Sequence, residues 1–341
     1  MGVEVTSSQD KEIDIMANMK TVVNQVIIAG ELIDFVNVKS GVSKNGNEYF
    51  KFNMVIETNK ETSEQHQVEF FEMKNNFDGK ENPRFKSMVT AYEEYKSRVT
   101  DGEGEIVRVT GRLTMNPYVS KNENKIINKI VVKGNSMHRD RGDEKEREKG
   151  LFDFCSIFKG MIFVDKLEEI DAENMKVKAL VNEYKSKKGA VGHLIDIDVI
   201  GKEYVDGVKA LLKENTIASI GLKIADVVDT VFLDEDKTVE LEKREMIGFG
   251  DGLREIQEYN DWVEKENERR KDLRENGLKI HRDALVITGC SRIFTEEDIE
   301  KEDLPFDRDS INDMFDLVED KMADLEAQLT YDNINDEDIP F

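Results

Sequence analysis

Aromatic and basic side chains alternate with apolar ones between Tyr49 and Thr58. Every second residue is a large apolar one: Phe50, Phe52, Met54 and Ile56. This period of two predicts a strand with one face in a core. The other face carries Tyr49, Lys51 and Asn53. Aromatic rings stack on bases and lysines bind phosphates, so this face has the chemistry of a surface that binds single-stranded nucleic acid.

The last ten residues, 332–341, have a different chemistry. The segment is acidic and ends in Ile-Pro-Phe with a terminal carboxylate. Proline favours an extended backbone, which presents the last ring and the carboxylate together to a pocket with a cation. We therefore predict a partner-binding tip formed by Asp336, Glu337, Asp338, Ile339, Pro340 and Phe341. The alternative is an ordinary acidic tail that happens to end in phenylalanine.

Residues arranged for catalysis are not evident in the sequence. It contains no glycine-rich phosphate loop, no nucleophile elbow and no Cys/His set with metal spacing. The four histidines are scattered, and Cys155 and Cys290 read as reduced core residues. We predict a protein that is not an enzyme and that holds neither metal nor cofactor.

Net charge is unevenly distributed along the 341 residues. The total is −24, but residues 19–139 hold 18 basic and 16 acidic residues, whereas residues 234–341 hold 15 and 34. The first part is therefore near neutral and compatible with a polyanionic ligand. No apolar run reaches the roughly 18 residues that a membrane helix needs, and residues 1–18 read as a disordered leader without a signal sequence.

Five strand patterns with one helical pattern between the third and fourth fill residues 19–139. This order predicts an OB-fold, a five-stranded Greek-key barrel. The predicted elements are strands near 22–30, 49–58, 66–74, 106–118 and 125–133, with a helix over 83–98.

A second, diverged OB-fold is predicted over 152–294, after a charged linker at 140–151. Its pattern is interrupted near 253–276 by a charged helical insertion, which we read as a solvated helix rather than a DNA contact. An acidic helical segment, 295–331, then precedes the tip, with helical spacing over 310–329. The predicted fold class is mainly β with helical insertions.

Three segments resemble the bacterial single-stranded-DNA-binding protein family. They are Asn24–Leu32 (NQVIIAGEL), Glu64–Phe71 (EQHQVEFF) and Val107–Leu113 (VRVTGRL), and the acidic Ile-Pro-Phe ending resembles the family's tip. The resemblance covers about 120 residues plus the tip. It implies that Phe71 and Tyr118 stack on bases, and that the tip recruits replication and repair enzymes. The flexible linker usual in the family is replaced here by the helical pattern.

Further candidates for binding single-stranded DNA are basic residues near these aromatics. In the first barrel they are Lys51, Arg108, Arg112 and Lys121. In a predicted hairpin of the second barrel they are Tyr184, Lys185, Lys187 and Lys188, for which a plain solvated hairpin is the alternative.

The predicted function is that of a single-stranded-DNA-binding protein of replication, recombination and repair, in the bacterial cytoplasm or nucleoid. The fused architecture suggests a phage or mobile-element version. Family members usually assemble four barrels, so two per chain favour a homodimer. The alternative is an adaptor whose barrels bind protein and whose acidic C-terminal region mimics DNA.

Overall fold

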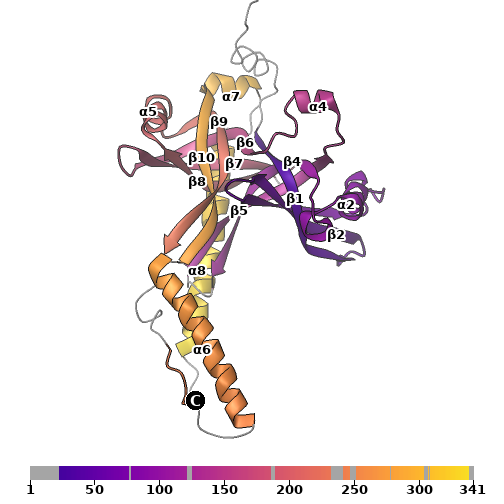
Figure 1. The fold of residues 1–341 in the computed structure, drawn as a ribbon. Helices are drawn as coiled ribbons and strands as arrows, with labels where there is room; N and C mark the ends of the chain where they lie inside the picture. The colour runs from indigo at the N-terminus through magenta and orange to yellow at the C-terminus, as the bar shows by residue number, and fades with distance from the viewer. Residues whose placement is uncertain are drawn as a thin grey trace, which may run out of the picture. The chain divides into compact units, whose positions relative to one another are not determined.

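The computed structural model describes residues 23–76, 78–120, 125–185, 189–231, 241–245, 251–276, 278–302, 306 and 308–337. The predicted leader, 1–18, lies outside these residues. The fold is mainly β, with helices between and after the strands (Figure 1). None of the described helices is long and apolar enough to span a membrane. Contacts divide the chain into two compact units, Asp226–Arg282 and the remainder.

The first five strands close into a ring in the order β1-β2-β3-β5-β4-β1. Neighbouring strands of this ring run antiparallel, except β3 and β5, which run parallel. Two helices separate the third strand from the fourth. This is the predicted OB-fold, which we call the first barrel. Its elements are β1 (Asn24–Val42), β2 (Glu48–Asn59), β3 (Glu64–Met73), α2 (Pro83–Glu94), α3 (Arg98–Asp101), β4 (Ile106–Ser120) and β5 (Lys125–Arg139).

The next five strands repeat this topology. They close in the order β6-β7-β8-β10-β9-β6, again with a parallel pair between the third and fifth strands. We call this ring the second barrel; it confirms that the diverged half has the OB topology. Its elements are β6 (Cys155–Glu169), β7 (Asn174–Lys185), β8 (Gly189–Ile200), α5 (Lys202–Leu211), β9 (Thr216–Val231) and β10 (Leu278–Phe294). The domain limits named from the sequence stay predictions.

The two barrels meet where β1 pairs with β6. Asn24–Ala29 lies antiparallel to Cys155–Gly160, which joins the rings into one ten-stranded sheet. Buried apolar residues of both barrels form one continuous cluster. Two ion pairs cross the seam in opposite directions: Arg112 Nε lies 2.9 Å from Glu183 Oε1, and Lys223 Nζ lies 3.1 Å from Glu64 Oε2. The barrels are therefore held as one body.

A part-buried side-chain amide adds hydrogen bonds to this seam. The Asn24 side chain donates to the carbonyl of Leu113 in β4 at 2.9 Å and to that of Asn182 in β7 at 3.3 Å. Its carbonyl oxygen also accepts from the Leu113 N–H at 2.8 Å. One side chain on β1 thus bonds to strands of both barrels.

Three more helices follow or separate the barrels: α4 (Glu144–Glu148), α7 (Glu296–Glu302) and α8 (Arg308–Glu337). The last is longer than the predicted 310–329, because no glycine or proline interrupts the sequence before Pro340. Phe306, just before α8, is 1% exposed and belongs to the core beneath the helix.

The unit Asp226–Arg282 contains α6 (Asp251–Asn276), a helix at the place of the predicted helical insertion, 253–276. The side-chain amide of Asn267 exchanges hydrogen bonds with the backbone of Leu241 at 2.7 and 2.9 Å. The basic cluster on the helix is internally paired, since Glu266 binds both Arg269 and Arg270. These pairs favour the interpretation of α6 as a solvated helix.

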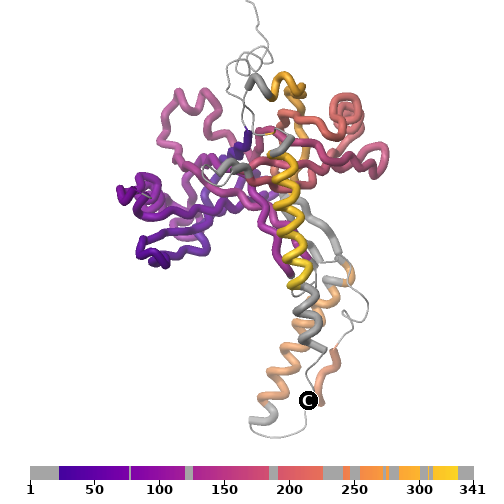
Figure 2. Tube along the Cα trace, turned by 180° about the vertical axis from the view of Figure 1, so that it is seen from behind, coloured from indigo at the N-terminus to yellow at the C-terminus, as the bar shows by residue number. Residues whose placement is uncertain are grey.

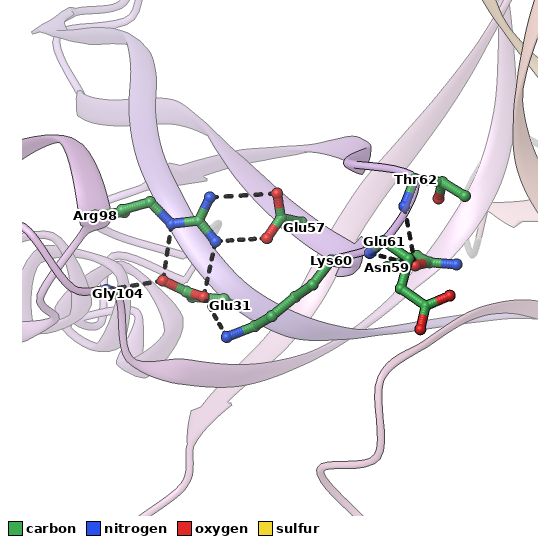
Figure 3. Close-up of polar contacts among 8 residues, drawn as sticks. All are labelled: Glu31, Glu57, Asn59, Lys60, Glu61, Thr62, Arg98 and Gly104. Atoms are coloured by element: carbon green, nitrogen blue, oxygen red, sulfur yellow. Dashed lines mark hydrogen bonds and ion pairs between the residues drawn. The ribbon is translucent and has the colours of Figure 1, made fainter.

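An ionic cluster joins the neighbouring strands β1 and β2 to α3 (Figure 3). Glu31 and Glu57 are buried, 5% and 4% exposed, and the guanidinium of Arg98 in α3 donates to both carboxylates. Lys60 Nζ lies 3.0 Å from Glu31, and the Gly104 N–H donates to the same carboxylate. Hydrogen bonding from Arg98 is the main cause that lowers the pKa of Glu31 to about 2, against the opposing effect of burial.

We expect Glu31→Gln to lower the free energy of unfolding by about 3 kcal/mol at pH 7. The pKa falls from 4.5 to about 2 on folding, and one pKa unit corresponds to about 1.4 kcal/mol. Because the folded pKa is the lower one, this contribution is present above about pH 4.5 and is lost as the pH falls towards 2. Urea unfolding at pH 7 and pH 3 measures the difference.

The exposed Glu61, whose carboxylate makes no contact among those in Figure 3, supplies the matched control Glu61→Gln. The control is expected to change stability little at either pH. Equal losses in both variants at pH 7 would contradict the role given to the Glu31 carboxylate.

Candidate nucleic-acid interface

The predicted residues Tyr49, Lys51 and Phe71 lie together on the outer face of the first barrel. Lys51 is the cross-strand partner of Phe71, and cross-strand partners share a face. Phe70 is 2% exposed and Phe71 47%, so Phe70 enters the core and Phe71 faces outward. This exposure is compatible with the stacking role that the family resemblance implies for Phe71.

The rings of Tyr49 and Phe71 stack on each other. Their centroids are 5.7 Å apart and their planes differ by 29°. The Tyr49 ring also lies directly over Gly41, where a Cβ would sit 2.8 Å from the tyrosine hydroxyl oxygen. Glycine at 41 thus leaves room for the ring to lie against the sheet, and the pair forms a preset aromatic surface.

Two residues of this surface were not predicted. Lys39 of β1 lies opposite Lys51, and Met73 of β3 lies opposite Tyr49. Lys39 escapes a period-of-two reading because the register shifts between Val36 and Lys39, where Asn37 has a φ of 55°. We call Lys39, Tyr49, Lys51, Phe71 and Met73 the aromatic face.

The other first-barrel candidates lie elsewhere. Tyr118 is 42% exposed in the β4–β5 hairpin, opposite Ile127, and among the described residues no ring contact links it to the aromatic face. Arg112 is held at the seam by Glu183. Arg108 lines a cavity between α2 and the ends of β4 and β5. Lys121 lies outside the described residues.

The predicted hairpin of the second barrel forms, since Lys185 pairs with Gly189. Tyr184 and Lys185 lie in β7, but their side chains are outside what the structure describes, as are Lys187 and Lys188. The outer face of β7 and β8 shows mixed charge instead of aromatics: Lys176 pairs with Asp198, Lys178 with Asp196, and Asn174 with Ile200.

Helix α8 covers part of that same face (Figure 2). Met314 is fully buried against Gly192 of β8, where a Cβ would lie 2.7 Å from the Cβ of Met314. The ring of Phe315 meets Phe163 of β6 edge-on at 6.0 Å. An acidic helix therefore occupies the surface that corresponds to the outer face of the first barrel's first three strands.

The predicted partner-binding tip is only partly described. Asp336 and Glu337 lie at the end of α8, with side chains outside the description. Asp338, Ile339, Pro340 and Phe341 lie outside the described residues. In the described ranges, no three His, Cys, Asp or Glu side chains are grouped so as to hold a metal ion.

We expect Gly192→Val to displace α8 from the second barrel, because the added side chain would overlap Met314 and Leu180. Amide hydrogen exchange should become faster in α8 and stay slow in the core strands of the first barrel. Gly289→Val on β10 is the matched control, since a Cβ there meets no atom within 4 Å. Unchanged exchange in α8 would show that this contact does not hold the helix.

The search for curated proteins of similar sequence found no match. A Thermus aquaticus single-stranded DNA binding protein has 12% identity and a TM-score of 0.36, covering 61% of this chain and 87% of its own. The mitochondrial protein Rim1 of S. cerevisiae has 13% identity and a TM-score of 0.22, covering 34% of this chain and 92% of its own.

Those likenesses are too weak to support an argument, so the fold assignment rests on the strand order described above. The family model described as YorF matches residues 23–267, which is more than two thirds of the chain. The chain belongs to the YorF family.

Proposed function

We propose that this protein binds single-stranded DNA on the aromatic face of its first barrel. The stacked Tyr49–Phe71 pair, with Phe71 exposed and Tyr49 half-buried, carries this proposal. Base–aromatic stacking contributes roughly 1–3 kcal/mol per base and tolerates any sequence. Lys39 and Lys51 flank the pair, and in the described part of the chain neither makes an ion pair. They are therefore available to phosphates.

The first barrel is the DNA-binding half in this proposal. The corresponding face of the second barrel carries paired charges and α8, which has ten acidic and two basic residues between Arg308 and Glu337. A helix of that charge repels a phosphate backbone. The second barrel then serves as the support for the first barrel and for α8.

The finer role that we propose is to coat and protect single strands in replication, recombination and repair. The tip that ends at Phe341 would recruit the enzymes of these processes, and two chains would assemble as a homodimer. The acidic residues of this tip are tethered to the barrels, so they would also compete with DNA for the basic surface of the first barrel.

An adaptor is the second candidate. The acidic α8 docked on the second barrel is the observation that favours it, because a helix of this charge resembles a nucleic-acid strand to a partner. An adaptor would bind protein and would show no salt-dependent binding of single strands.

We expect Phe71→Ala and Tyr49→Ala each to weaken binding of a dT30 oligonucleotide by about 5- to 150-fold, the loss that corresponds to one stacked base. Lys51→Ala should weaken binding less and lower the salt slope by about 0.7, the value for one phosphate contact on a single strand. Fluorescence anisotropy at two or more salt concentrations measures both quantities.

Tyr204→Ala in α5 is the control, since Tyr204 is 46% exposed and Phe71 47%. It should leave affinity unchanged. If the wild type binds dT30 but all three aromatic-face variants bind it equally well, the DNA site lies elsewhere.

Deleting residues 338–341 should abolish capture of partner enzymes while keeping α8 and both barrels. Binding of a panel of purified replication and repair enzymes to the full chain, to this deletion and to Phe341→Ala can be compared by calorimetry. Loss of the terminal ring alone should remove most of the affinity, because the ring is the largest apolar group in the tip. A partner that binds all three forms equally would exclude the tip as its site.

A further inference from the structure

A group of cationic side chains borders a hollow away from the aromatic face. This half-open cavity of about 710 Å³ is lined by α2, by the ends of β4 and β5, and by residues 141–152. This volume is in the range of small-molecule sites. Four cations border it, Lys86, Arg108, Arg139 and Arg141, against the carboxylates of Glu94 and Glu146.

Three of these cations form no ion pair in the described part of the chain, although two carboxylates line the same cavity. Arg139 is paired, with Glu94 and Glu105 each at 3.4 Å. Lys86, Arg108 and Arg141 make no ion pair with any described residue. Arg108 is also only partly exposed, on a strand between the buried Val107 and Val109. Arg108 faces the cavity without an ion-pair partner among the described residues, so its guanidinium is available to an anionic ligand.

The cavity also has an aromatic and apolar wall. Phe152 and Leu151 line one side, and Tyr95 lines another, with the guanidinium of Arg139 5.3 Å above its ring. Burial raises the pKa of the Tyr95 hydroxyl, so the group stays protonated and can donate a hydrogen bond. Flat apolar surface beside several guanidinium groups is the combination that binds a base and its phosphate.

The cavity is connected to the aromatic face through α2. The helix starts beside the end of β3, where the Asn82 side chain donates to Glu72 at 2.9 Å and to the Met73 carbonyl at 3.0 Å. Met73 belongs to the aromatic face, and Lys86 lies one turn into the helix. Twelve residues of helix span about 18 Å. A single strand that leaves Met73 along α2 therefore reaches the cavity within a few nucleotides.

We propose that this cavity is a second nucleotide-binding site, which takes a base against Phe152 and Tyr95 and its phosphate against Arg108 and Arg141. The proposal rests on the proposed function, because the strand it binds is the one held on the aromatic face. Short oligonucleotides occupy the aromatic face alone, and longer ones also fill the cavity.

The direct test places a fluorophore in the cavity. Trp262 is the chain's one tryptophan, so Trp262→Phe with Phe152→Trp leaves a single reporter at position 152. Titration with dT30 should quench it, and titration with millimolar inorganic phosphate should not. Quenching by phosphate alone would identify a site for free anions and overturn the proposal, as would the absence of any quenching by dT30.

A second measurement separates this proposal from the proposed function. Arg108→Ala with Arg141→Ala should lower the salt slope for dT30 by about 1.4, the value for two phosphate contacts, and leave affinity for a short dT6 unchanged. Lys202→Ala with Lys213→Ala, two exposed cations on the second barrel, is the matched control. If Phe71→Ala weakens binding and the double arginine variant does not, the cavity proposal fails while the proposed function stands. If the wild type binds no single strand, both fail.

Discussion

The antiparallel pairing of β1 with β6 is the constraint on which the rest of the structure depends. The first half of β1 uses both of its edges, one for β4 and one for β6, and β6 likewise lies between β1 and β9. Separating the barrels would expose two strand edges and the buried side chains of Asn182 and Glu183. The barrels consequently behave as one folded body with a shared core.

Within this body, the two barrels have the same topology and different outer faces. The first leaves a stacked aromatic pair and two lysines open to solvent. The second covers the corresponding strands with α8, so closely that Gly192 has no room for a side chain. The two barrels of the repeated fold therefore differ in their outer faces, and in our proposal the first binds the ligand while α8 packs on the second.

Much of the fold can be predicted from local sequence patterns, whereas the candidate nucleic-acid interface can be predicted only in part. The period of two in β2 predicts both the buried Phe52 and the outward Tyr49 and Lys51, as the structure has them. Which of Phe70 and Phe71 faces outward depends on the register of β3 with β2. Lys39 could not be placed on this face from alternation, because the register of β1 shifts near Asn37. These features depend on pairing between strands, which a single strand's sequence does not contain.

The ion pair of Arg112 likewise could not be predicted from the local sequence. Its sequence context suggests a phosphate contact, but its partner Glu183 lies in the other barrel, far away in sequence. The end of α8 is a different case: the helix continues because its sequence lacks a stop signal, whereas the predicted 310–329 followed only the apolar spacing. Long-range partners and the absence of stop signals are thus the two sources of difference between prediction and structure.

In our proposal the first barrel holds single-stranded DNA by stacking and by phosphate contacts. The most direct measurement is a calorimetric titration of the wild-type chain with poly(dT) and with duplex DNA of equal length, at low and moderate salt. We expect stoichiometric binding of poly(dT) that weakens as salt rises, and much weaker binding of the duplex, whose bases cannot stack on Tyr49 and Phe71. Equal affinity for the two, or no binding of poly(dT) at low salt, would contradict it.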